Sequence, residues 1–237
     1  MEAALEMERN GADIIDIGGE STRPGAAYVS LDEELERVVP AVEELRKRSG
    51  VVISVDTRKS AVAAAAVGAG ADIINDISAL EDDPETVVLA ARENKYLILM
   101  HKQGRPDTMQ INPSYEDTVS EIRDYLLSRA EAAMTAGVPR DRIILDPGIG
   151  FGKRQEDNLA ILKNIDVFKE TGFPLLIALS RKSFIGNILG NDPEERLAGT
   201  LAANLFSLVH GADIVRVHDV KETSDTLKIA KELTWIG

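Results

Sequence analysis

Seven short apolar runs rich in β-branched residues recur along this chain, and longer stretches with helical periodicity separate them. The runs occupy residues 13–18, 51–56, 72–77, 96–101, 142–146, 175–180 and 213–218. Runs that are apolar throughout are typical of parallel strands buried on both faces. Alternation of such strands with helices, joined by right-handed crossovers, predicts a parallel sheet wrapped by helices.

The intervening stretches carry clear helix signals. Residues 31–48 place apolar side chains on one helical face, and these are Leu35, Val38, Val39, Val42 and Leu45. Residues 114–136 predict a second long helix, with Ser114 as its N-cap and Gly137 just past its end. A short helix is expected over residues 2–10.

A Gly-Ala-Asp triplet precedes three of the predicted strands, at Gly11, Gly70 and Gly211. Glycine commonly ends a helix in a left-handed conformation, so we expect these triplets to form helix-to-strand corners at one end of the sheet. A closed barrel of this type has eight strands. With seven visible, the pattern by itself fits either a barrel that lacks one strand or an open, doubly wound sheet.

The bulk composition narrows the function classes. The 237 residues, 44% of them hydrophobic, are enough for one sizeable core, so a single domain over residues 1–237 is expected. A net charge of -13 disfavours binding to nucleic acid or to an anionic membrane. The absence of cysteine excludes disulfides and cysteine-bound zinc. No apolar run is long enough to span a bilayer, and a cytoplasmic location is expected.

Polar residues gather where the predicted strands end. They are Asp16, Asp56, Asn75, Asp76, His101, Asp146, Ser180, Arg216 and His218. One such residue means little, because turns favour Asp, Asn and Ser. Repetition at nearly every strand is different, since barrel enzymes carry their catalytic groups at the carboxyl ends of the strands. We therefore predict an active site there, although His101 is better explained as a hydrogen-bonded core or lip histidine.

Two loops carry further information. Residues 18–25 contain two glycines and a Pro-Gly turn, and Thr22 with Arg23 offers groups that bind an anion. Read alone, this is an ordinary surface loop. Residues 146–153 resemble a phosphate loop, but Arg154 follows Lys153 where that motif needs Ser or Thr, so a nucleoside triphosphate site is rejected. The glycines instead allow a loop that folds close to a flat ligand, with Phe151 available to stack.

Two strand ends carry positive charge. Residues 180–183 place Arg181 and Lys182 beside hydroxyls near the start of a helix, which suits an anion. Arg216 and His218 are two apart on a strand and share a face. If Ile214 is on that face, both point inward and the buried arginine needs a counter-anion, either a diphosphate or an internal carboxylate such as Asp16.

Seven stretches together resemble dihydropteroate synthase, a pterin-binding family of the folate pathway. They are DIGGESTRPGA, SVDTRKS, INDIS, LMHKQG, LDPGIGFGK, ALSRKSFIG and RVHDVKET. They lie in the family's order and extend from Asp16 to Thr223, nearly the whole chain. The resemblance implies a TIM-type (β/α)8 barrel and a reaction that joins 6-hydroxymethyl-7,8-dihydropterin diphosphate to p-aminobenzoate. The products are 7,8-dihydropteroate and diphosphate.

The resemblance also implies roles for individual residues. Asp146 accepts two N–H groups from the guanidine-like edge of the pterin, as a carboxylate can. Asn75 and Asp56 complete the recognition of the ring, and Lys182 holds its carbonyl and N5 side. Arg216 and His218 bind the diphosphate and act with Lys182 as the catalytic groups. The p-aminobenzoate site is formed by Thr22, Arg23, Phe151 and Ser183.

By the same resemblance the C–O bond to diphosphate breaks first, and the aromatic amine then attacks the resulting pterin cation. Mg²⁺ is the implied cofactor, sulfonamides are the implied inhibitors, and a homodimer is the implied assembly. Family members begin with a further strand, whose Asn touches the metal, followed by a loop rich in Asp, Ser and Gly. This sequence starts after both. We therefore expect a barrel that lacks its first strand, and no metal ligand is identifiable in this chain.

Two other functions stay open at this point. A barrel of the methyltetrahydrofolate:corrinoid methyltransferase type shares the fold and the pterin-facing Asp and Asn. The GESTRPG, SRKS and RVHD segments argue against it, because methyl transfer needs no diphosphate pocket. A pterin-binding protein without full catalysis is the second alternative, because the expected first strand is absent.

Overall fold

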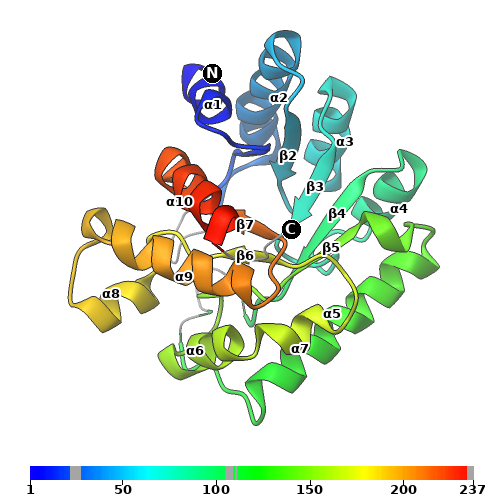
Figure 1. Cartoon of the computed structure of the whole chain (residues 1–237). Coiled ribbons are helices and arrows are strands. Elements are labelled where there is room, and N and C mark those ends of the chain that lie inside the picture. Colours follow the sequence, from blue (N-terminus) through cyan, green and yellow to red (C-terminus); the bar gives the residue numbers. More distant parts are fainter. Residues whose placement is uncertain (22–27, 105–108, 110, 234–237) are drawn as a thin grey trace.

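The computed structural model describes residues 1–21, 28–104, 109 and 111–233. Helices surround a central set of strands (Figure 1). The strands are β1 (Ile14–Gly18), β2 (Val52–Asp56), β3 (Ile73–Asp76), β4 (Tyr96–Met100), β5 (Ile143–Asp146), β6 (Leu176–Ala178) and β7 (Ile214–Arg216). Each lies within one of the seven predicted runs, which confirms all of those predictions.

Ten α-helices follow or precede the strands in the described residues. They are α1 (Glu2–Arg9), α2 (Leu31–Arg48), α3 (Ser60–Ala69), α4 (Glu85–Arg92), α5 (Thr118–Thr135), α6 (Gln155–Lys163), α7 (Ile165–Lys169), α8 (Ser183–Leu189), α9 (Leu197–Val209) and α10 (Val220–Leu233). Helix α2 matches its predicted range, and Ser30 caps it by accepting the backbone N–H of Glu33 at 3.3 Å.

All strand pairs are parallel. Strands β1 to β5 pair in chain order, β6 pairs with β7, and a bridge between Leu145 and Leu175 joins the two groups. Across the described residues, ladder pairing thus runs from β1 round to β7, but no ladder joins β7 to β1. This is the predicted parallel (β/α) barrel with seven visible strands rather than a doubly wound sheet.

The register of the strands places their carboxyl ends at one level. Asp56 lies opposite Gly18 on β1 and opposite Asn75 on β3, and Asp146 lies opposite Met100. The polar residues that were recognised at separate strand ends therefore lie at one mouth of the barrel. The fold brings them together although they are far apart in the sequence.

The predicted corners are present at the other mouth. Gly11, Gly70 and Gly211 have φ values of 100°, 117° and 112°, in the left-handed region that disfavours residues with a Cβ atom. At Gly70 the preceding helix α3 ends, and the backbone N–H of Ala71 bonds to the carbonyl of Ala66. The chain then turns directly into β3.

The prediction for the start of the fifth helix was wrong. Helix α5 begins at Thr118, and its N-cap is Asp117, whose side chain accepts the N–H of Ser120 at 3.1 Å. Ser114 instead bonds through its backbone N–H and carbonyl to the side chain of Gln103. Both residues are good caps by type, and the tertiary contact to Gln103 decides between them. None of the helices in the described residues combines the length and apolar character needed to cross a bilayer.

Candidate active site

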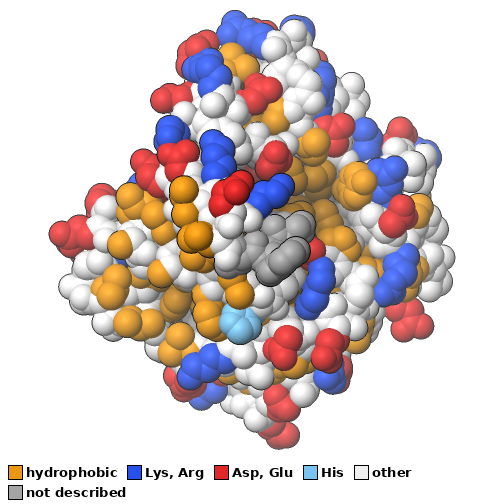
Figure 2. Space-filling view, viewed as in Figure 1, with side chains coloured by type: hydrophobic (Ala, Val, Ile, Leu, Met, Phe, Trp, Pro, Cys, Tyr) orange, Lys and Arg blue, Asp and Glu red, His pale blue; other side chains and the backbone are white. Residues whose placement is uncertain are grey.

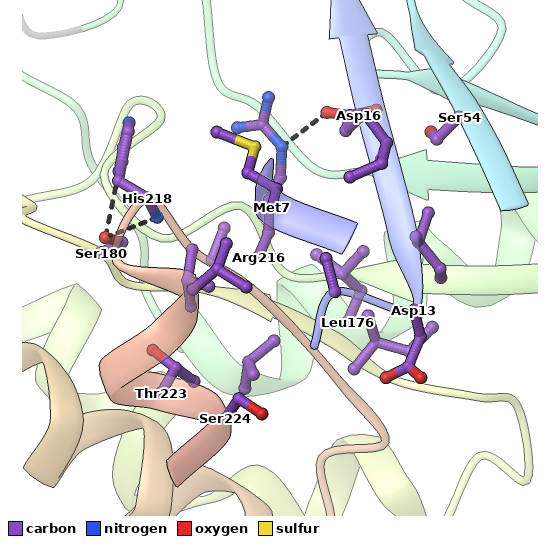
Figure 3. A pocket seen from close by; sticks show the side chains of 18 of the residues that line it. Met7, Asp13, Asp16, Ser54, Leu176, Ser180, Arg216, His218, Thr223 and Ser224 are labelled. Carbon is purple, nitrogen blue, oxygen red and sulfur yellow. Dashed lines mark hydrogen bonds and ion pairs between the residues drawn. The ribbon is translucent and has the colours of Figure 1, made fainter. Parts of the chain in front are cut away.

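A cavity of about 560 Å³ lies between β1 and β7 and extends from the start of these strands, at Gly11 and Asp213, to their carboxyl ends. It runs along β1, β6 and β7, and helix α10 forms part of its wall (Figure 3). Of the predicted site residues, Asn75, Lys182, Arg216 and His218 line it, together with Asp16 and Ser180. Cavities of this volume hold ligands of the size of a small nucleotide.

Arg216 connects β7 to the ends of β1 and β2, and in the described residues no backbone ladder joins β7 to either strand. Its Nε lies 2.6 Å from Asp16 Oδ2, and its Nη2 lies 3.3 Å from Asp56 Oδ2. The contact with Asp16 is visible in Figure 3. An internal carboxylate, one of the two counter-anions considered from the sequence, therefore pairs with this arginine.

The burial expected for Arg216 and His218 was wrong. Both line the cavity with Ile214, as expected from their shared face, but both residues are exposed, and the Arg216 side chain retains 46% of its accessible surface. The reason is the open side of β7, where the described residues show no neighbouring strand. Arg216 is thus paired with carboxylates and still accessible to a ligand.

Asp56 is a buried carboxylate whose surroundings disfavour its charged form. It is 8% exposed at the end of β2. Burial, with the nearby charge of Asp16, raises its pKa to about 7, and the positive charge of Arg216 opposes that rise. The charge of Asp56 therefore depends on Arg216, and this carboxyl group titrates near neutral pH.

Asn75 lies between these groups at the end of β3. The side chain is buried, and its Nδ2 lies 3.5 Å from Asp16 Oδ2, at the outer limit of a hydrogen bond. An amide in this position offers both a donor and an acceptor to a ligand in the cavity.

Asp146 and Lys182 are two further charged groups of the mouth, and each affects the pKa of the other. Burial raises the pKa of Asp146, and Lys182 together with the N–H of Gly148 opposes the rise. Gly148 donates to Asp146 Oδ1 at 2.7 Å, which fixes the orientation of the carboxylate. Burial lowers the pKa of Lys182 to about 8, and Arg216 adds to the decrease. The Lys182 ammonium donates to the carbonyl of Ile149.

His218 is oriented by a serine of the neighbouring strand end. Its Nδ1 lies 3.0 Å from Ser180 Oγ, and its backbone N–H donates to the same oxygen at 3.1 Å (Figure 3). Ser180 therefore fixes both the backbone and the ring of His218.

The predicted p-aminobenzoate residues are only partly placed. Thr22 and Arg23 lie outside the described residues. Phe151 is half-buried, and its ring centroid is 5.0 Å from Lys182 Nζ. Phe151 therefore lies at the edge of the charged residues of the barrel mouth. Ser183 follows Lys182 directly and is exposed at the first position of α8, and no hydrogen bond joins its side chain to the other predicted residues that the structure describes.

An ion-pair network lies just before the residues 22–27. Glu20 pairs with Arg58 and with Lys59, and Lys59 also pairs with the buried Glu34. Burial works to raise the pKa of Glu20, but the contacts with Lys59 and Arg58 outweigh it and hold that pKa below its usual range. The network fixes the last described part of the loop against the start of α3.

Three residues of the site were not predicted as such. Asp16 had the strand-end signal and was considered only as a partner for Arg216. Ser180 had the same signal, but nothing in the sequence shows that it holds His218. Lys153 had no signal, because a lysine after a glycine-rich loop is normally solvated, yet it is 3% exposed. Its Nζ lies 2.9 Å from Nδ1 of His101, so His101 is the hydrogen-bonded histidine that was expected.

The described residues do not fit a magnesium site made by the protein alone. They contain no group of three or more His, Asp or Glu side chains placed to hold a metal ion. Of the strand-end carboxylates, Asp16 and Asp56 are already engaged by Arg216. Mg²⁺ is usually bound by one or two carboxylates together with substrate phosphates.

Comparison with known proteins shows the family of this chain. The family model described as pterin binding enzyme matches residues 1–218. A dihydropteroate synthase of Synechocystis sp. is 48% identical over 231 residues, which cover 97% of this chain and 80% of the relative.

Two solved structures are similar in the same way. The Yersinia pestis dihydropteroate synthase with a sulfonamide drug complex has a TM-score of 0.95 and 43% identity, over 98% of this chain and 84% of that one. The Xanthomonas albilineans dihydropteroate synthase with 4-aminobenzoic acid has a TM-score of 0.93 and 42% identity, over 98% and 83%. The chain belongs to the pterin-binding enzyme family, among the dihydropteroate synthases.

Proposed function

We propose that this chain condenses 6-hydroxymethyl-7,8-dihydropterin diphosphate with p-aminobenzoate to give 7,8-dihydropteroate and diphosphate. The observation that carries the proposal is the charge arrangement at the barrel mouth. Arg216, Lys182 and His218 lie on the same side as the buried carboxylates Asp56 and Asp146. One substrate with a neutral ring rich in N–H groups and a polyanionic tail matches both halves.

The pterin is assigned to the carboxylate half. Asp146 Oδ2 and the remaining lone pairs of Oδ1 are free to accept adjacent N–H groups of the ring. Asn75 supplies both a donor and an acceptor, and Asp56 accepts a further N–H. Lys182, with its pKa of about 8, donates to the ring carbonyl and N5 side. The pterin therefore replaces water around carboxylates whose burial would otherwise be costly.

The diphosphate is assigned to Arg216 and His218. The C–O bond to diphosphate breaks, and its electron pair leaves with the diphosphate, so negative charge grows next to the guanidinium. The amine of p-aminobenzoate then attacks the exocyclic carbon of the pterin cation and loses a proton to solvent. When bound to the diphosphate oxygens, Mg²⁺ would offset part of the negative charge of the leaving group.

The p-aminobenzoate is assigned to Thr22, Arg23, Phe151 and Ser183. Phe151 offers an aromatic face next to Lys182. Arginine binds a carboxylate through two parallel N–H groups, which suits Arg23. The ion pairs of Glu20 with Arg58 and Lys59 support this assignment, because they anchor the chain directly before Thr22.

Location, domain and assembly are part of the same proposal. A cytoplasmic enzyme is consistent with the absence of cysteine in this sequence. The 237 residues are proposed to act as one domain. The homodimer implied by resemblance is supported by an apolar surface on α8 and α9 (Figure 2), where Ile188, Leu189, Phe206 and Val209 are exposed.

Diphosphate release by the purified chain tests the proposal. We expect release from the pterin diphosphate that depends on p-aminobenzoate and that a sulfonamide inhibits by competing with p-aminobenzoate. Transfer of a methyl group from methyltetrahydrofolate to a corrinoid, with no release of diphosphate, would support the methyltransferase alternative.

One observation favours a second candidate function. No ladder joins β7 to β1 in the described part of the chain, and Arg216 is exposed at that gap. A protein that binds the pterin without turnover would leave the diphosphate intact with or without p-aminobenzoate. In that case pterin binding by calorimetry would persist while no diphosphate is released.

A further inference from the structure

Lys153 is a buried lysine that the proposed reaction leaves without a role. It follows the glycine-rich loop after β5 and is 3% exposed. Its Nζ lies 2.9 Å from His101 Nδ1, 3.0 Å from the carbonyl of Phe151 and 3.2 Å from the carbonyl of His101. One amino group therefore connects the end of β4 to the loop that follows β5.

Burial of the Lys153 amine lowers the stability of the fold, so a role in filling space does not explain why a lysine occupies this position. Burial lowers its pKa well below the usual range, and burial with the charge of Lys153 lowers the pKa of His101 to about 2. The imidazole is therefore neutral. An apolar side chain of similar length would fill the same volume without desolvating an amine. What it would not supply is a set of directional hydrogen bonds.

The loop that Lys153 holds is packed closely against the residues that directly follow β4. Gly148 has a φ of +67°, and a Cβ atom there would lie 1.9 Å from the His101 carbonyl oxygen. At Gly152 the corresponding distance to the Gln103 carbonyl oxygen is 2.2 Å. Lys153 lies at the end of this interface and bonds to the same His101 carbonyl that limits Gly148.

Phe151 lies between two lysines in this arrangement. Its carbonyl accepts from Lys153, and its ring lies 5.0 Å from Lys182 Nζ on the cavity side. By contrast, Asp146 is set by its own ladder contact with Met100 and by the Gly148 N–H. Lys153 is therefore better placed to fix Phe151 than to fix Asp146.

We propose that Lys153, through its bonds to His101 and to the Phe151 carbonyl, is a positioning residue that sets the Phe151 ring for binding of p-aminobenzoate. This inference rests on the proposed function, in which Phe151 contacts p-aminobenzoate. It assigns a specificity role to a buried amine that touches neither substrate. Loss of the amine would leave the pterin half of the site largely intact and would loosen the p-aminobenzoate half.

The test compares Lys153→Met with Lys163→Met, a matched substitution at an exposed lysine near the end of α6. For Lys153→Met we expect the KM for p-aminobenzoate to rise by about tenfold or more, because a small displacement of a group that contacts the substrate weakens the interaction strongly. The KM for the pterin diphosphate is expected to stay within about threefold of the wild-type value, because the residues that contact the pterin are unchanged. Lys163→Met changes neither value.

His101→Leu provides a second route to the same answer. It removes the imidazole acceptor and leaves both carbonyls, so we expect a smaller rise in the same KM. In the double variant the effects of the two substitutions are expected not to add, because both remove the same contact between Lys153 and His101. If Lys153→Met does not fold, His101→Leu alone carries the test through the same ratio of KM values.

The outcomes separate this inference from the proposed function. A lower melting temperature with both KM values unchanged, or an equal rise in both, overturns the positioning role. A wild-type chain that releases no diphosphate with p-aminobenzoate contradicts the proposed function. Calorimetry with p-aminobenzoate, in the presence of a pterin and diphosphate, then decides the inference. Weaker binding to Lys153→Met than to wild type supports it, and equal binding or none overturns it.

Discussion

Arg216 Nη2 lies 3.3 Å from Asp56 Oδ2, so the arginine proposed to bind diphosphate contacts a carboxylate proposed to bind the pterin. The two residues are 160 positions apart and belong to strands that share no ladder. Each stabilises the charged form of the other, because Arg216 opposes the rise in the pKa of Asp56 and Asp56 helps to raise that of Arg216. Occupancy of the diphosphate half is thereby linked to the charge of the pterin half.

Replacement of Arg216 by alanine is expected to reduce kcat/KM for the pterin diphosphate by about 10²–10³, the range seen when one preorganised donor to a developing anion is removed. Stopped-time assays of diphosphate release measure this. Arg216→Lys keeps the charge but loses the planar fork, so an intermediate decrease is expected. Arg123→Ala, a surface arginine on α5 that pairs with Asp124, serves as the control. An unchanged rate in Arg216→Ala would remove the residue from this role.

Pterin binding is expected to weaken as the pH falls through about 7, because Asp56 with its raised pKa becomes protonated and loses an acceptor. Binding is also expected to weaken above about pH 8, where Lys182 loses its charge. Calorimetric titration with 6-hydroxymethylpterin from pH 5 to 9 measures the profile. In Arg216→Ala the acid limb moves to higher pH, since the charge that holds the pKa of Asp56 down is gone. An acid limb that stays in place would show that the two groups are not linked.

Asp146→Asn is expected to weaken pterin binding and to stabilise the fold at the same time. Loss of a charge-assisted hydrogen bond costs roughly 1.5–3 kcal/mol of binding. The pKa of Asp146 is raised in the folded state, so its ionised form destabilises the protein above that pKa. The substitution therefore raises the free energy of unfolding at pH 8, by about 0.5–2 kcal/mol.

At a pH below the unfolded pKa of Asp146 this gain in stability disappears, because the carboxyl is then protonated in both states. Urea denaturation at pH 8 and at pH 3.5 measures the difference between the two conditions. A variant that is less stable than wild type at pH 8 would show that the carboxylate charge is favourable in the fold, contrary to the geometry.

Gly148→Ala is expected to destabilise the protein by about 1–3 kcal/mol, the cost of a residue with a Cβ atom in a strained conformation. The added Cβ would lie 1.9 Å from the His101 carbonyl oxygen, and φ there is +67°. Gly68→Ala in α3 is the matched control, since nothing lies within 4 Å of its added Cβ. That control gains roughly 0.5–1 kcal/mol from helix propensity. Thermal denaturation of both variants distinguishes them, and equal stability would refute the close contact.

The barrel was predictable from the sequence because parallel strands buried on both faces leave continuous apolar runs, and because Gly11, Gly70 and Gly211 mark helix ends. The polar residues at the ends of the predicted strands indicated which mouth of the barrel carries the active site. The sequence contains no comparable signal for the partner of a polar residue. The pairing of Arg216 with Asp16 joins positions 200 residues apart, and the burial of Lys153 against His101 depends on how one loop packs on another.

The wrong predictions have the same origin. Ser114 and Asp117 are equally good caps by residue type, and a contact with Gln103 selects the start of α5. Arg216 was expected to be buried because strand alternation places it inward. Its exposure depends instead on what lies next to β7, which alternation within one strand does not indicate.

The central claim is that the barrel mouth performs the complete condensation. Mass spectrometry of the reaction of the purified chain with the pterin diphosphate, Mg²⁺ and ring-labelled p-aminobenzoate tests this directly. The predicted result is labelled 7,8-dihydropteroate, formed in amounts equal to the diphosphate released and formed far more slowly by Arg216→Ala. Bound pterin with no labelled dihydropteroate would contradict the claim.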